Sequence, residues 1–326
     1  MKAFEYAAPS SETEAVRLLT ESAQTEVLAG GTDLVGLMKA MIVQPQRVVN
    51  IMEIDSLKTI DRGDDGGVRI GAAVSLEALI DSSDLDEYAA VKQAARGVNS
   101  MQMQCQGTLG GDLCQRPRCW YYRSGHDLLG PQAEQGDNSL HAVLGNEGPA
   151  KFVSASRIAP ALIAWGAKLR IAGPDPDQEL LLEAADFFRT PRNGSQRETV
   201  LEPGQLLTHV LLPPAEGRLS ATYEVKHGCG PEDPLAAAAV TFTHSGGVVQ
   251  DASIVLGHVA PTPWPAADAA RSLVQLTISP ETAARAGDLA VAHATPLSNN
   301  EYKVQLAKVA VKRAILRAAG LDTGGL

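Results

Sequence analysis

The sequence comprises 326 residues with a formal net charge of −10 at pH 7, and 44% of its residues are hydrophobic. This length allows two domains with a sizeable core. The acidic balance argues against nucleic acid and anionic membrane surfaces as partners, because both would repel the chain. Four cysteines in so long a chain do not form a disulfide scaffold, so we expect reduced thiols.

No stretch reaches the ~18 apolar residues that a membrane-spanning helix needs. The N-terminal residues, Met1 to Tyr6, do not combine a basic region with an apolar one, as a signal peptide would. We therefore expect a cytoplasmic protein, which is exported only in association with a partner that has a signal.

The N-terminal part of the chain alternates between helical and extended patterns. Apolar residues at helical spacing predict a helix over residues 11–22, capped by Ser11, and another over 34–42. Short apolar runs predict strands at 26–29 and 47–51. This alternation is typical of a small α/β unit.

The chain then mixes helices and strands with longer connections. Residues 124–150 are polar and rich in Gly, Asn, Gln and Asp, which predicts an exposed loop insertion. Ser75 is placed to cap a short helix. The other elements predicted before residue 173 are strands at 68–73 and 168–172 and helices at 88–99 and 160–165.

A domain boundary is indicated at Pro213-Pro214, which is followed by Glu216-Gly217. Beyond it lie three candidate strands and an Ala-rich tail of helical character, at residues 221–226, 236–243, 253–259 and 281–319. We predict an α+β fold class, with a first domain at residues 1–215 and a smaller α+β domain at 216–326.

The first candidate site is the loop Ala29-Gly30-Gly31-Thr32-Asp33-Leu34, between a predicted strand and a predicted helix. Glycines permit the positive φ angles that turn successive amides toward an anion, and a helix start adds unpaired N–H groups. A pyrophosphate fits such a place. A tight turn in which Thr32 or Asp33 caps the helix accounts for the same residues equally well.

A second loop, Gly107-Thr108-Leu109-Gly110-Gly111-Asp112, is again dense in glycine. The sequence has neither the G-x-G-x-x-G fingerprint of a Rossmann site nor a P-loop. Together the two loops predict a dinucleotide held by two separate loops.

Both loops are similar to the FAD-pyrophosphate loops of molybdenum-hydroxylase flavoproteins, the family of xanthine dehydrogenase and aldehyde oxidoreductase. The family has Asn where this chain has Asp112, which weakens any side-chain hydrogen bond assigned there. Four more segments resemble family motifs in the same order, so that the resemblance covers nearly the whole chain: residues 154–165, 201–207, 223–233 and 256–264.

The resemblance implies an FAD-binding domain in two parts, a small α/β unit and a larger α+β unit as in vanillyl-alcohol-oxidase-like proteins, followed by a C-terminal α+β domain like that of CO dehydrogenase flavoproteins. It implies that Lys226 lies near the isoalloxazine ring, although a surface role fits this lysine as well. The other residues implied to bind FAD are Ala29, Gly30, Gly31, Thr32, Asp33, Leu34, Gly107, Thr108, Gly110, Gly111 and Asp112.

The resemblance also implies a heterotrimer with a large molybdopterin subunit and a small iron–sulfur subunit that holds two-iron clusters. Substrate is oxidised on the partner, so we predict no catalytic residue on this chain. Electrons pass from the clusters through FAD to an external acceptor, which stays open between NAD, oxygen, a quinone and a ferredoxin.

The segment Cys114 to Arg123 resembles a subgroup related to periplasmic aldehyde oxidoreductase, in which a loop insertion after this motif holds a four-iron cluster. The insertion here contains no cysteine. Because such a cluster normally needs four thiolates, we expect none and predict no metal site. The weak candidate ligands are Cys105, Cys114 and Cys119, with His126, His141 or Cys229 as a fourth.

Two other functions account for part of the pattern. A stand-alone FAD oxidoreductase of the same fold would turn over a substrate by itself, but the sequence shows no covalent-flavin motif and no evident acid–base set. A scaffold subunit that has lost its flavin would keep the fold and be colourless.

Overall fold

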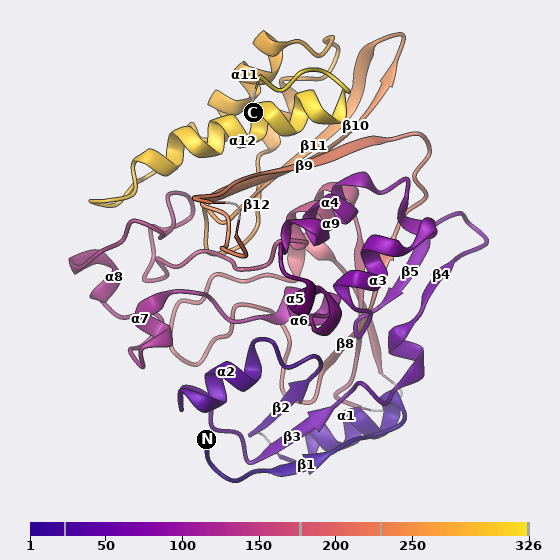
Figure 1. Ribbon diagram of the computed structural model, residues 1–326, viewed down its shortest axis with the longest axis vertical. Coiled ribbons are helices and arrows are strands. Elements are labelled where there is room, and N and C mark those ends of the chain that lie inside the picture. The colour runs from indigo at the N-terminus through magenta and orange to yellow at the C-terminus, as the bar shows by residue number, and fades with distance from the viewer. Residues whose placement is uncertain (23, 176–177, 229, 325–326) are drawn as a thin grey trace.

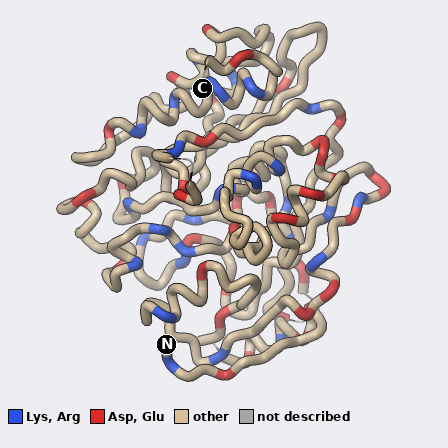
Figure 2. The backbone as a smooth tube through the Cα atoms, in the orientation of Figure 1, with Lys and Arg blue, Asp and Glu red and all other residues tan. Residues whose placement is uncertain are grey.

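The computed structural model describes residues 1–22, 24–175, 178–228 and 230–324. Three parts follow one another along the long axis of the molecule: an N-terminal unit, a central unit and a C-terminal domain (Figure 1). Acidic and basic residues are interspersed over all three parts (Figure 2). In the described part of the chain, no helix is both long and apolar enough to cross a bilayer.

The N-terminal unit is a three-stranded parallel sheet in the order β1-β3-β2. Its elements are β1 (Glu5–Ala7), α1 (Glu12–Thr20), β2 (Thr25–Leu28), α2 (Leu34–Lys39) and β3 (Arg47–Asn50). Ser11 caps α1 as predicted, because its hydroxyl accepts the Glu14 amide at 3.2 Å. The buried face of α1 packs in one cluster with Val49 of the sheet and with Leu206 of the central unit, which fixes the unit to its neighbour.

The central unit is built on a five-stranded antiparallel sheet in the order β4-β5-β8-β6-β7. Its strands are β4 (Ile60–Arg62), β5 (Val68–Gly71), β6 (Lys168–Ala172), β7 (Glu179–Glu183) and β8 (Leu206–Leu212). Its helices and 3-10 turns are η1 (Asp55–Lys58), α3 (Leu76–Asp81), η2 (Ser83–Leu85), α4 (Ala89–Gly97), α5 (Met101–Gln106), α6 (Leu109–Cys114), α7 (Trp120–Arg123), α8 (Gln132–Gln135), α9 (Ala159–Trp165) and η3 (Ala184–Asp186). Tyr88 and Trp165 anchor the core, with ring centroids 4.6 Å apart.

The C-terminal domain is a four-stranded antiparallel sheet in the order β12-β11-β10-β9. Its elements are β9 (Leu219–Val225), β10 (Ala236–Ser245), β11 (Val248–Gly257), β12 (Trp264–Pro265), α10 (Ala267–Arg271), α11 (Pro280–Ala290) and α12 (Tyr302–Ala318). Helices α4 and α9 cover one face and α12 the other (Figure 1). Successive side chains of a strand point to opposite faces of the sheet, and both faces of β10 are covered. The strand is therefore apolar along its buried part: Ala239 lies in the central core and Ala238 in the C-terminal core.

The predicted helical tail at 281–319 is interrupted, because residues 291–301 are not helical. Pro296 cannot continue a helix that begins before it. The turn after it is closed by Asn300, whose side chain accepts the Leu297 amide at 2.6 Å. Two helices, α11 and α12, therefore replace the single helical stretch.

The prediction that residues 124–150 form an exposed insertion was wrong for its second half. His141 to Leu144 are buried, and Val143 and Leu144 belong to the core of the C-terminal domain. The polar composition was misleading because an asparagine of this segment satisfies buried backbone groups: Asn146 donates to the carbonyls of Ala142 and Thr295, both at 2.9 Å. The division between residues 215 and 216 falls in the link between β8 and β9, and we retain it as a proposal.

Candidate functional site: a cavity between two glycine loops

A cavity of 430 Å³ lies between the N-terminal unit and the central unit. Its size is within the range of about 300–1,000 Å³ usual for ligand and cofactor pockets. All six residues of the first loop, Ala29 to Leu34, line it, and so do Thr108, Gly110 and Gly111 of the second. The fold thus brings together two loops that are nearly 80 residues apart in the sequence.

The first loop offers a row of unused amides. Gly31 has φ +73°, which turns the chain between β2 and α2. Within the described residues, the amides of Gly30 through Leu34 have no hydrogen-bond acceptor, whereas the next amide, that of Val35, donates to the Gly31 carbonyl at 3.3 Å. Consecutive free amides at a helix start attract an anion, so this loop suits a pyrophosphate.

The second loop contributes differently, because its amides are already committed. Leu109 donates to the carbonyl of Val74 at 2.9 Å and Gly110 to that of Ala72 at 2.8 Å. Gly111 donates to the Thr108 hydroxyl at 3.1 Å, which caps α6. The loop is therefore anchored to the residues that follow β5, and the Thr108 hydroxyl, which lies in the cavity lining, keeps its own hydrogen for another partner.

Two glycines are required by close backbone contacts. A Cβ atom on Gly30 would lie 1.5 Å from the carbonyl oxygen of Gln106, just before the second loop. A Cβ atom on Gly110 would lie 2.9 Å from the carbonyl oxygen of Ala72. The two loops touch through backbone atoms at Gly30, so a side chain there would force them apart.

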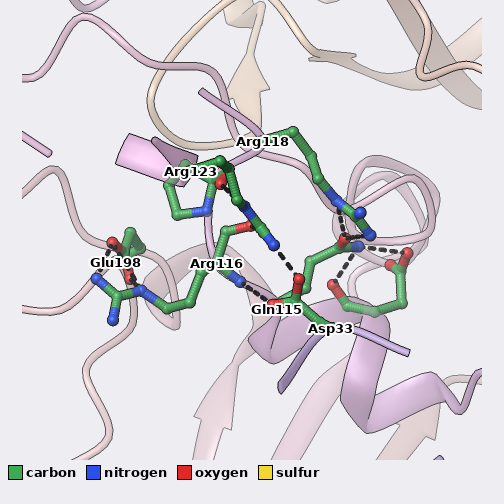
Figure 3. Close-up of polar contacts among 8 residues, drawn as sticks. Asp33, Gln115, Arg116, Arg118, Arg123 and Glu198 are labelled. Carbon is green, nitrogen blue, oxygen red and sulfur yellow. Dashed lines mark hydrogen bonds and ion pairs between the residues drawn. The ribbon is translucent and has the colours of Figure 1, made fainter. Parts of the chain in front are cut away.

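Asp33 stands at the N-cap position of α2, but its side chain caps no amide of that helix. One carboxylate oxygen accepts the Arg116 amide at 2.9 Å, and the other accepts from the Arg123 guanidinium at 2.7 Å (Figure 3). Its charge is thus paired with Arg123, which weakens the repulsion between the Asp33 carboxylate and a phosphate bound in the cavity.

The arginines of the Cys114–Arg123 segment stabilise the rim of the cavity. Arg116 forms an ion pair with Glu198, with Nε 3.0 Å from Oε2 (Figure 3). Arg123 donates to the Pro117 carbonyl at 2.9 Å, in addition to its pair with Asp33. The rim therefore joins the N-terminal unit, through Asp33, to the central unit.

Three predicted residues lie outside the lining of this cavity. Gly107 is buried beneath it. Asp112 points into the interior, where it accepts from the Ser156 hydroxyl and from the Ile158 amide at 3.1 Å; desolvation raises its pKa despite these bonds. Lys226 donates to the Gly97 carbonyl at 2.6 Å, and its predicted place beside the isoalloxazine ring stays a prediction.

The cysteines are dispersed. Cys105 is exposed on α5. Cys114 lines the cavity and is exposed to it, and desolvation by the surrounding protein raises the pKa of its thiol to about 12. The Sγ atom of Cys119 lies 3.3 Å from the Nε2 atom of His141. Among the described residues, no three His, Cys, Asp or Glu side chains are arranged to hold a metal ion. Cys229 lies outside the described residues.

One wall of the cavity is formed by residues 189–207 and includes Arg189, Arg197 and Glu198. Residues 201–207 resemble a family motif, but none of this wall was predicted to bind the cofactor. A bridge between Phe188 and Thr199 folds this segment back on itself. Arg197 pairs with Glu26 of β2, so the wall is also tied to the N-terminal unit.

These features define an FAD-binding oxidoreductase subunit, and comparison with known proteins agrees. Residues 2–215 match the family model of the FAD binding domain in molybdopterin dehydrogenase, and residues 234–318 match the CO dehydrogenase flavoprotein C-terminal domain. The chain belongs to the FAD-binding medium subunits of the molybdenum hydroxylase family. The predictions of family, fold class and FAD as cofactor are thereby confirmed.

Relatives match over nearly their whole length. The aldehyde oxidoreductase FAD-binding subunit of Escherichia coli K12 is 30% identical, with 94% of this chain and 96% of the relative covered. The carbon monoxide dehydrogenase medium chain of Afipia carboxidovorans is 30% identical, with 97% and 96% covered. The crystal structure of the Cu,Mo-CO dehydrogenase superposes with a TM-score of 0.77 at 28% identity, covering 98% of each chain.

Proposed function

We propose that this chain is the flavoprotein subunit of a molybdenum hydroxylase complex of aldehyde oxidoreductase or xanthine dehydrogenase type. It receives electrons from iron–sulfur clusters on a partner and passes them through FAD to an external acceptor. The row of free amides at Gly30 to Leu34, inside the cavity between the two loops, is the observation that carries this proposal.

When bound, FAD supplies the redox chemistry, accepting electrons from the clusters and releasing them to the acceptor. The chain supplies binding and position. The amides of the first loop and the Thr108 hydroxyl are placed to donate to the pyrophosphate, and the Asp33–Arg123 pair holds the first loop against the rim. We further propose that the protein works in the cytoplasm.

A first prediction concerns partners. Purification from the native host should bring down a large molybdopterin subunit and a small cysteine-rich subunit with this chain. The physical reason is that a flavin subunit needs an electron donor, and the described residues provide no metal-ligand set of their own. Subunit masses and the molybdenum content of the purified complex test this. A catalytically competent homo-oligomer would contradict it.

A second prediction concerns iron. The isolated chain should contain no four-iron cluster, because Cys105, Cys114 and Cys119 are not gathered into a ligand set with a fourth donor among the described residues. Cys119→Ser should leave both iron and flavin content unchanged. Iron per chain after anaerobic purification is the measurement. A value of about four, with a paramagnetic signal on reduction, would show that the prediction is wrong.

A further inference from the structure

Arg189 lines the cavity without any partner for its side chain. Its Nε atom is buried and has no hydrogen-bond acceptor, and within the described residues its guanidinium forms no ion pair. An arginine presents five donors and stays charged, so a guanidinium left unpaired beside a cavity is costly unless a ligand satisfies it.

The other two arginines that line the cavity are committed. Arg116 pairs with Glu198, and Arg197 pairs with Glu26. The lining also includes Asp33, which pairs with Arg123 at the rim. Arg189 is therefore the cation of this wall whose charge is available to a ligand.

Arg189 is connected to the first loop by a short series of contacts. Its amide donates to the Glu198 carbonyl at 2.9 Å, and the Glu198 side chain pairs with Arg116. The Arg116 amide in turn donates to the side chain of Asp33, a residue of the loop with the free amides. The backbone of Arg189 is thus connected, through Glu198 and Arg116, to the anion-binding loop.

We propose that Arg189 is an FAD-binding residue that donates to the pyrophosphate, on the wall opposite the free amides of Gly30 to Leu34. This deepens the FAD site described above and rests on it. A planar guanidinium matches pairs of phosphate oxygens, and the bond between a cation and a phosphate is charge-assisted. Amides from one wall and a guanidinium from the other would then enclose the two negative charges.

The test is FAD affinity in the full-length chain freed of flavin, measured by fluorescence titration. Arg189→Met should raise the Kd for FAD about 10- to 100-fold, the loss expected for one charge-assisted hydrogen bond. Arg189→Lys retains the positive charge but loses the planar guanidinium. Its Kd for FAD should lie between that of the unmodified chain and that of Arg189→Met. Arg192→Met is the matched control, since Arg192 is exposed, lies outside the cavity lining, and should bind FAD as the unmodified chain does.

A second readout separates the pyrophosphate from the flavin ring. With FAD saturating, Arg189→Met should leave the flavin absorption spectrum and midpoint potential unchanged, because a phosphate contact stabilises oxidised and reduced FAD equally. An unchanged Kd overturns the proposal, and so does a weaker Kd with a shifted potential, which would place the guanidinium on the ring. Failure of the unmodified chain to bind FAD would instead overturn the site itself.

Discussion

Gly30→Val should strip FAD from the protein. A Cβ atom at this position would lie 1.5 Å from the Gln106 carbonyl oxygen, so the substitution separates the two loops and moves the free amides away from the pyrophosphate. We expect about one FAD per unmodified chain and a Kd for FAD at least about tenfold higher for the variant, because losing the bonds of the first loop to the pyrophosphate costs more than about 1.4 kcal/mol. The ratio of flavin to protein absorbance in the purified chain is the measurement.

Gly36→Ala is the matched control for this experiment. Gly36 lies within α2, two residues after the free amides, and a Cβ atom there meets nothing within 4 Å. The control should keep its flavin, and alanine should favour the helix slightly over glycine. Gly31→Val and Gly110→Val should also lose flavin and remain folded. Full flavin retention in Gly30→Val and Gly110→Val together would refute the assignment of these loops.

Lys303→Met should destabilise the fold strongly. Lys303 is 1% exposed, and its ammonium donates to the carbonyls of Leu140, His141 and His258 at 3.0, 3.1 and 2.8 Å. Methionine leaves these buried acceptors without that donor, at about 1–3 kcal/mol each. We expect a loss of roughly 3 kcal/mol or more, and a fall of roughly 6–12 °C in Tm. Lys308→Met, which removes a more exposed lysine of the same helix, should change little.

The pH dependence provides a check on the same residue. Desolvation lowers the pKa of Lys303 to about 7, below the value of about 10.4 for an unfolded lysine. Its contribution to stability is therefore fully present above about 10.4 and is lost as the pH falls through 7. The difference in unfolding free energy between the unmodified chain and Lys303→Met should grow as the pH rises from 7 to 10. A constant difference, or an unchanged Tm in the variant, would contradict this account.

Local signals were sufficient where neighbouring residues decide the structure. Ser11 and Ser75 cap helices as predicted, because a cap depends on residues three positions away. The Ala29–Leu34 loop forms a strand–turn–helix for the same reason. The loop at Gly107 to Asp112 has the expected glycines, but two of its amides donate to Ala72 and Val74, just after β5, and this depends on long-range packing.

Other parts of the site had no local signal. Arg189 and Glu198 reach the cavity because a bridge folds their segment back, and nothing in their immediate sequence requires it. The direction of the Asp112 carboxylate could not be predicted, since the groups that donate to it, the Ser156 hydroxyl and the Ile158 amide, lie more than 40 residues later in the sequence. Residues of this kind are positioned by the assembled fold.

The burial of Val143 and Leu144 in the C-terminal core has a consequence for synthesis. Among the side chains that surround them are those of α12, which begins more than about 150 residues further along the chain. At translation rates of about 5–20 residues per second, the segment waits on the order of ten seconds or more for this helix. Until then the nascent chain exposes apolar surface at Val143 and Leu144 that the finished fold covers.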